Sequence, residues 1–201
     1  GDLTSEIIKL AIGTKHEVLE GLFFPDTYHY VRSDTPVSIL LRANKIMRVK
    51  LQDAWSGKDD HLLLKTSYEL LILASIIEKE AAVAQEKTRI SGVFINRLRK
   101  NMRLQTDPTV IYGLSDEFTG DLTREHLVKD TPYNTYTRNG LPPTPISCPG
   151  WDSLFAAAHP EKHDLFYFVA KGDGTHHFSK TLEEHQQAVK TYQRRNESKD
   201  Q

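Results

Sequence analysis

The spacing of hydrophobic positions predicts a mainly helical chain. Apolar residues recur at three- and four-residue intervals through much of the sequence, the pattern of a helix with one buried face. Two predicted helices begin with clear signals, because Thr35 stands before Pro36 and Thr66 stands three residues before Glu69. A threonine caps the free amides of a first turn, and proline fits the first helical position. We expect helices over residues 3–11, 36–57, 66–84, 88–99, 123–128, 152–158 and from 181 onward.

Other stretches carry strand and loop patterns. Residues 18–31 are rich in aromatic and β-branched side chains around a Pro-Asp pair, which predicts two short strands and a turn. Residues 165–170 and 175–179 flank Lys-Gly-Asp-Gly, a hairpin sequence. Residues 101–150 are rich in proline and glycine, which predicts a long loop region. The expected fold is α+β, with helices packed on a small antiparallel sheet and a loop-rich region framing a cleft.

Composition narrows the functional classes. The chain has 201 residues, of which 38% are hydrophobic, enough for one domain with a buried core. Its net charge is −1, so no positive excess indicates nucleic-acid binding. The single cysteine, Cys148, cannot form an internal disulfide, and no apolar run reaches the ~20 residues of a membrane span. Because the chain opens on Gly1 rather than Met, we expect it to be a piece of a longer protein.

One carboxylate occupies an unexpected position. Successive helical residues turn by about 100°, which places Glu80 inside the apolar arc of the 66–84 helix, between Ile76 and Leu73. Glu78 lies about 200° away and off the centre of the arc. Apolar surroundings raise the pKa of a carboxyl group, and a raised pKa suits a general acid. A buried Glu80 paired with an arginine, or a bend that frees its side chain, explains the same pattern without catalysis.

Several sequence blocks resemble one enzyme family. The stretch Leu-Ala-Ser-Ile-Ile-Glu-Lys-Glu-Ala at 73–81 resembles the signature of the endolytic murein transglycosylases, the MltG or YceG-like family. Further blocks resemble those of the family in the same order, so the resemblance extends from about residue 19 to residue 189. These blocks lie at 19–28, 93–98, 102–113, 133–136, 140–146, 156–160 and 168–170.

This resemblance implies an activity and a place of action. The family cleaves peptidoglycan glycan strands between N-acetylmuramic acid and N-acetylglucosamine, consumes no water and leaves 1,6-anhydromuramyl ends. Its catalytic glutamate corresponds to Glu80, which the helical geometry also selects, and Glu78 is the alternative. The resemblance further implies contact with cell-wall synthesis proteins at the periplasmic face of the inner membrane. A membrane anchor and a LysM-like region are expected outside this chain.

On this basis the chain is expected to divide into three parts. Residues 1–35 are a remnant of an N-terminal subdomain, residues 36–195 are the catalytic transglycosylase domain, and residues 196–201 are a polar tail.

Other polar residues are candidates for the site. Asp107 is the best candidate for a second carboxylate, although an aspartate before proline is also typical of a turn. Sugar sites combine flat rings with a few polar groups, and each candidate of this kind is equally suited to tying loops together. The predicted substrate-binding residues are Asn96, Gln105, Thr106, Tyr133, Asn134 and Tyr136.

No cofactor or metal is expected. The histidines His159, His176 and His177 lack the spacing of a metal site, so a structural or substrate-contact role is expected. A lyase that uses pyridoxal phosphate needs a phosphate cradle, and the sequence has no glycine-rich loop for one. Two alternatives stay open. One is a muramidase that uses water, and the other is a peptidoglycan-binding or scaffold module without catalytic turnover.

Overall fold

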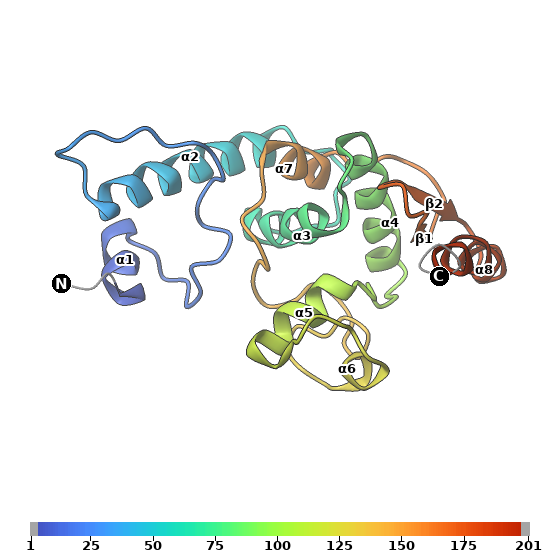
Figure 1. Cartoon of the computed structure of the whole chain (residues 1–201). Helices are drawn as coiled ribbons and strands as arrows, with labels where there is room; N and C mark the ends of the chain where they lie inside the picture. Colours follow the sequence, from blue (N-terminus) through green and yellow to red (C-terminus); the bar gives the residue numbers. More distant parts are fainter. Residues whose placement is uncertain (1–3, 198–201) are drawn as a thin grey trace.

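The fold is α+β, as the sequence predicts, and its body is helical. The computed structural model describes residues 4–197, which form eight α-helices, two 3-10 helices and one two-stranded sheet (Figure 1). The elements are α1 (Ser5–Ile12), α2 (Pro36–Ser56), α3 (Ser67–Glu80), η1 (Ala84–Glu86), α4 (Lys87–Arg99), α5 (Asp107–Leu114), η2 (Ser115–Glu117), α6 (Arg124–Val128), α7 (Trp151–Ala158), β1 (Tyr167–Ala170), β2 (His176–Ser179) and α8 (Leu182–Glu197).

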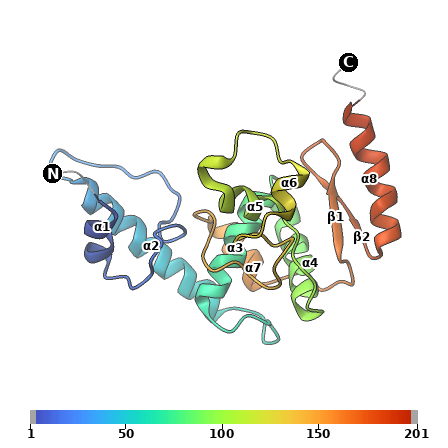
Figure 2. The ribbon, with the colours of Figure 1, turned by 90° about the horizontal axis from the view of Figure 1, so that it is seen from below.

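The elements are arranged along one long direction. Helix α1 lies at one end, and α2 runs from there to α3, α4 and α7 in the middle, while β1, β2 and α8 lie at the other end (Figure 1, Figure 2). None of the helices within residues 4–197 is long and apolar enough to span a membrane. Part of the predicted tail, residues 198–201, lies outside the described residues, and the predicted boundary at residue 35 stays a prediction.

Helix α3 forms the centre of the core. Its residues Leu70–Ile77 are all buried, and the helix packs against α2, α4, α5 and α7. A helix surrounded by protein has no solvent face, which is why Ser75, predicted on the polar side, is buried as well. The Ser75 hydroxyl accepts a hydrogen bond from the Ile146 amide at 3.0 Å. The helix ends at Glu80 rather than near residue 84, because Ala81 has an extended backbone.

The prediction of strands in residues 18–31 is wrong, since this stretch has no regular structure. Its backbone groups bond to α2 instead of to a partner strand. The Leu22 carbonyl accepts from Asn44 Nδ2 at 2.9 Å, and the Phe24 amide donates to the Ala43 carbonyl at 3.1 Å. Leu22 is itself buried in the core, so the apolar side chains of this stretch find core partners without a sheet.

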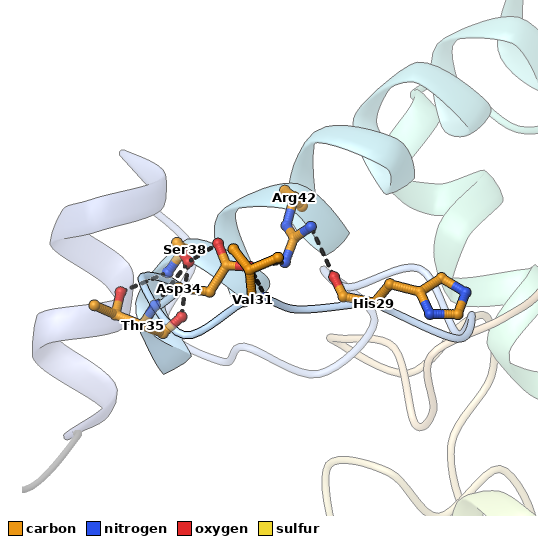
Figure 3. A network of polar contacts seen from close by, with 6 residues as sticks. All are labelled: His29, Val31, Asp34, Thr35, Ser38 and Arg42. Carbon is orange, nitrogen blue, oxygen red and sulfur yellow. Dashed lines mark hydrogen bonds and ion pairs between the residues drawn. The ribbon is translucent and has the colours of Figure 1, made fainter.

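The start of α2 fastens the connecting segment to the helix. Thr35 Oγ1 accepts from the Ser38 amide at 3.1 Å, which confirms the predicted cap. The Asp34 carboxylate accepts from the Ser38 hydroxyl at 3.2 Å and from Arg42 Nη2 at 3.3 Å (Figure 3). Arg42 Nη1 also donates to the His29 carbonyl at 3.0 Å (Figure 3). Side chains of α2 therefore hold residues 29–35 in place.

The region between residues 101 and 150 is only partly loop. The short helix predicted near residues 123–128 is present as α6, whereas α5 was not predicted. The signals for α5 are present in the sequence, because Pro108 stands in its first turn and Asp107 places a negative charge there. An Asp-Pro pair is typical of turns as well as of helix starts, so the pattern alone did not separate them.

The predicted hairpin is confirmed. Strands β1 and β2 pair antiparallel, with Tyr167 opposite Ser179 and Ala170 opposite His176. Helix α8 packs on this small sheet at the end of the molecule (Figure 2). The hairpin and α8 thereby form a wall beside the end of α3.

Gly92 allows α4 to lie against the segment that leads to the hairpin. A Cβ atom at this position would come within 2.3 Å of the Glu161 carbonyl oxygen and 2.6 Å of His163 Nε2. We expect Gly92→Ala to lower the free energy of unfolding by about 1–3 kcal/mol, because backbone must move to admit the methyl group. Urea denaturation measures this loss.

The neighbouring Ser91 provides a matched control. Its hydroxyl is buried and has no hydrogen-bond partner among residues 4–197. Ser91→Ala removes an unpaired polar atom, so we expect it to leave stability unchanged or to raise it slightly. An equal loss in both variants would contradict the role given to Gly92.

Candidate active site

A cleft of about 460 Å³ opens where the end of α3 meets the hairpin, α8 and the loop region. This volume lies within the usual range for ligand pockets. The cleft is lined by Glu80, Arg97, Leu104, Gln105, Asp107, Tyr136, Tyr167, Phe168, Val169, Ala170, His176, Leu182, His185 and Val189. The structure thus brings four of the predicted site residues to one cavity.

Glu80 is the last residue of α3 and reaches this cleft from the core. Its Oε1 accepts a hydrogen bond from the Thr106 hydroxyl. Its Oε2 makes no hydrogen bond to the described residues and is not among their fully buried unpartnered atoms. Burial raises the pKa of Glu80, and the negative charge of Asp107 raises it further, while Thr106 and His176 act in the opposite direction. One oxygen is therefore held and the other is free.

Glu78 has a different environment. Its Oε2 accepts from Lys87 Nζ at 3.1 Å, from the Ser153 hydroxyl at 2.5 Å and from the Gly150 amide at 3.3 Å. Burial opposes its ionisation, but these hydrogen bonds and the charge of Lys87 outweigh it, so the pKa of Glu78 is lowered. The side chain joins α3 to α4 and α7, and Glu78 does not line the cleft. Two carboxylates two residues apart thus have pKa values shifted in opposite directions.

Asp107 and Tyr136 form a pair at the mouth of the cleft. The Tyr136 hydroxyl donates to Asp107 Oδ1 at 2.5 Å. Burial and this bond to a carboxylate both raise the pKa of Tyr136, so its hydroxyl stays protonated. Tyr136 is held in turn by Arg103, whose Nη1 donates to the Tyr136 carbonyl at 3.0 Å. The pair offers the cleft a fixed ring and one carboxylate.

Four predicted substrate-binding residues, Asn96, Thr106, Tyr133 and Asn134, are not among the residues that line the cleft. Asn96 Nδ2 donates to the carbonyl of His163 at 2.8 Å and to that of Leu165 at 3.1 Å. The Tyr133 hydroxyl bonds to Thr144 Oγ1 at 2.8 Å. Asn96 thus ties α4 to the segment before β1, and Tyr133 ties two loop segments together.

Asn134 is another of these residues, and it is buried. Its Nδ2 donates to the Lys129 carbonyl at 2.7 Å, and its Oδ1 accepts from the Tyr136 amide at 2.8 Å. It therefore connects the end of α6 to the tyrosine that lines the cleft. Substrate binding stays a prediction for all six residues, Asn96, Gln105, Thr106, Tyr133, Asn134 and Tyr136.

Arg97 is a cleft residue that the sequence did not single out. It is buried, and its guanidinium donates to the carbonyls of Phe166 at 2.6 Å, Leu104 at 2.8 Å and Arg103 at 3.1 Å. It also lies 5.1 Å from the centre of the Tyr167 ring. A charged residue inside a run of apolar helical positions was the available signal. Arg97 therefore ties α4 to both walls of the cleft.

Two histidines also line the cleft: His176, for which the sequence predicted a structural or substrate-contact role, and His185, which the sequence did not single out. His185 from α8 stacks on Tyr167 with ring centres 5.2 Å apart, and its Nδ1 is buried without a partner among residues 4–197. His176 Nδ1 lies 2.8 Å from Glu86 Oε2. The described residues contain no cluster of three His, Cys, Asp or Glu side chains suited to a metal ion.

The sequence is similar to those of known proteins along most of its length. The sequence model of the YceG-like family matches residues 3–191. An endolytic murein transglycosylase of Bacillus subtilis (strain 168) is 41% identical over 177 residues, which are 87% of this chain and 48% of that protein. A protein of the same name from Streptococcus pneumoniae serotype 2 (strain D39 / NCTC 7466) is 33% identical over 177 residues, 85% of this chain and 32% of that protein.

A solved structure is similar as well. The crystal structure of a YceG-like protein from Listeria monocytogenes matches with a TM-score of 0.74 at 40% identity, covering 88% of this chain and 58% of that chain. The chain therefore spans about half or less of the length of the curated relatives named above.

Proposed function

This chain belongs to the YceG-like family, and from that premise we propose that it is a lytic transglycosylase that cleaves peptidoglycan glycan strands endolytically. The single observation that supports this most is the state of Glu80. It is a carboxyl group with a raised pKa, one anchored oxygen and one unbonded oxygen at a cleft. A group of this kind is suited to donate a proton and to take one back.

The proposed reaction uses Glu80 twice. Protonated Glu80 gives its proton to the glycosidic oxygen while the bond from that oxygen to C1 of N-acetylmuramic acid breaks. The resulting carboxylate then accepts the proton of the muramyl C6 hydroxyl as O6 bonds to C1. One chain ends as 1,6-anhydro-N-acetylmuramic acid, the other carries a new hydroxyl on N-acetylglucosamine, and Glu80 returns to its acid form. The proton balance closes without water.

A second carboxylate is not needed as a nucleophile in this scheme. The cleft is lined by two carboxylates, Glu80 and Asp107, and Asp107 accepts the hydrogen bond from Tyr136. The substrate's own acetamido group supplies the stabilisation of the cation-like C1, as in enzymes that use substrate assistance. The Tyr136 and Tyr167 rings and the His185 side chain provide a mixed aromatic and polar lining.

The masses of the products test this proposal. Intact glycan strands are digested with the protein, and the new ends are identified by mass spectrometry. We expect 1,6-anhydromuramyl ends from internal cleavage. Reducing ends would replace the proposal with a hydrolytic muramidase, and binding without any cleavage would indicate a scaffold module.

The location and the partners follow from the same proposal. Peptidoglycan strands are the proposed substrate, and cell-wall synthesis proteins at the periplasmic face of the inner membrane are the expected neighbours. The similarity to endolytic murein transglycosylases supports the substrate, while the neighbours and the membrane face stay predictions.

The pH dependence of cleavage should follow the charge of Asp107. The acid form of Glu80 starts the reaction, so the rate falls as pH rises through the Glu80 pKa, which Asp107 helps to raise. Asp107→Asn removes that negative charge and leaves an oxygen that still accepts from Tyr136. We expect the alkaline limb of kcat/KM to move to lower pH in this variant.

Asp121→Asn is the matched control, because Asp121 is exposed and lies outside the cleft. Its pH profile should coincide with that of the unchanged protein. An alkaline limb that stays in place or moves upward in Asp107→Asn would contradict the proposed coupling to Glu80.

A further inference from the structure

Thr106 is unusual among the threonines that begin helices in this chain. Five others, at the starts of α1, α2, α3, α6 and α8, accept a hydrogen bond from the amide three residues later, as cap residues do. Thr106 begins α5 but makes no such bond. Its hydroxyl points to Glu80 Oε1 instead. Helix α5 therefore has no side-chain cap, and the Thr106 hydroxyl binds the Glu80 carboxyl group instead.

The backbone around Thr106 is clamped by Thr135 and Thr109. The Thr106 amide donates to Thr135 Oγ1 at 3.1 Å, and the Thr106 carbonyl accepts from Thr109 Oγ1 at 2.7 Å. The preceding residue, Gln105, has a φ of 51°, and its amide donates to the Thr135 carbonyl at 3.1 Å. All three threonines are at most 3% exposed, and hydrogen bonds are stronger in such a low dielectric.

The hydrogens of this network can be assigned from its geometry. A carbonyl can only accept, so the single hydroxyl hydrogen of Thr109 is committed to the Thr106 carbonyl. In the 2.8 Å contact between Thr109 Oγ1 and Thr135 Oγ1, Thr135 is therefore the donor. Thr135 then has both its hydrogen and a lone pair engaged. The Thr106 hydroxyl bonds to Glu80 alone among residues 4–197, so its hydrogen and its lone pairs are both available to Glu80.

We infer that Thr106 is a positioning residue whose hydroxyl stays bonded to Glu80 in both protonation states, reversing the direction of the hydrogen bond when the proton of Glu80 is on Oε1, and that Thr135 holds it there. When Glu80 is a carboxylate, the hydroxyl donates to Oε1. When the proton of Glu80 is on Oε2, the oxygen that is free at the cleft, the hydroxyl still donates to Oε1. When the proton is on Oε1, the same hydroxyl accepts a hydrogen bond from it through a lone pair. This inference rests on the proposed function in one respect only, namely that Glu80 alternates between acid and base during turnover.

Other charged or titratable groups also face Glu80. Asp107 approaches from α5, His176 from β2, Tyr136 from the loop region and Arg97 from α4. None of them donates a hydrogen bond to the Glu80 carboxyl within residues 4–197. Thr106 is thus the direct contact through which the position of the carboxyl group is controlled.

The test is a titration of Glu80 itself. The carboxyl carbon of Glu80 is followed by NMR in uniformly ¹³C-labelled protein as pH is changed, with Glu80→Gln used to assign the signal. We expect the midpoint to rise in Thr106→Val, because the carboxylate loses its donor, and to return to the original value in Thr106→Ser. Thr106→Ala lacks the hydroxyl without adding a methyl group at its place, and it should shift in the same direction if Thr106→Val folds poorly.

Thr123→Val is the matched control, because Thr123 caps α6 in the ordinary way. This variant should lower the melting temperature and leave the Glu80 midpoint unchanged. A Glu80 midpoint that is the same in Thr106→Val, Thr106→Ala and the unchanged protein overturns the inference.

Activity separates this inference from the proposed function. If both hold, Thr106→Val lowers kcat for glycan cleavage by about 10- to 100-fold, the range of a hydrogen bond to a charged group, and Thr106→Ser restores most of it. A shifted Glu80 midpoint together with cleavage that does not depend on Glu80 would leave the hydrogen bond established and the catalytic proposal refuted.

Discussion

Glu80→Gln is expected to lower the rate of glycan-strand cleavage by about 10²–10⁴-fold, the usual contribution of a general acid or base. Glutamine has nearly the same shape and still accepts the hydrogen bond from Thr106, but it can neither donate nor accept the transferred proton. Binding of glycan strands should persist, because the cleft and its rings are unchanged. The measurement is the initial rate of release of 1,6-anhydromuramyl ends.

Glu78→Gln is the control on the same helix. It leaves the proton-transfer group in place, so the rate per folded molecule should change little. It also removes the charge partner of Lys87, whose side chain is 11% exposed, and we expect a loss of about 1–2 kcal/mol in stability. The two variants together separate chemistry from folding.

The reverse result would assign the roles the other way. If Glu78→Gln abolished cleavage in a folded protein while Glu80→Gln retained it, the catalytic carboxylate would be Glu78. If cleavage persisted in both variants, neither Glu78 nor Glu80 would be an essential catalytic residue, and the mechanism with one catalytic glutamate would be refuted.

Arg97→Met is expected to lower the free energy of unfolding by about 2–4 kcal/mol, because three carbonyl groups in buried or part-buried hydrogen bonds lose their donor. These carbonyls belong to Arg103, Leu104 and Phe166, which lie on two sides of the cleft. Methionine keeps much of the volume and removes the guanidinium, so the loss reflects hydrogen bonding rather than a cavity. Denaturation in urea measures the stability.

The same substitution should also lower kcat/KM, since the segment that carries Thr106 is no longer tied to α4. Arg99→Met is the matched control, two residues further along the helix, because Arg99 is exposed and its hydrogen bond to Asn96 is long, at 3.5 Å. Arg99→Met should be close to neutral in both measurements. Equal effects of the two variants would show that the buried guanidinium has no special role.

Much of the helical framework is predictable from local signals. Thr35 with Pro36 marks the start of α2, Thr66 marks α3, and the Lys-Gly-Asp-Gly sequence marks the turn between β1 and β2. These signals act within a few residues, through caps, turns and the spacing of apolar side chains. They need no knowledge of distant parts of the chain.

Tertiary contacts decided the features that local patterns left open. Residues 18–31 have strand-like composition, yet their backbone bonds go to α2, because no partner strand is adjacent. Ser75 has the character of a surface residue and is buried, because α3 is enclosed by other helices. The spacing of apolar residues shows which face of a helix is apolar, but it does not show whether other elements cover the opposite, polar face.

The two glutamates illustrate the same division within the candidate site. The sequence by itself placed Glu80 on the apolar face of its helix and Glu78 off the centre of that face, and the family resemblance narrowed the chemistry to one carboxyl group. The partners of these residues come from far along the chain: Lys87 and Ser153 engage Glu78, while Thr106 holds Glu80. A pKa depends on burial and on neighbours in space, so only the tertiary structure decided that the two carboxyl groups shift in opposite directions.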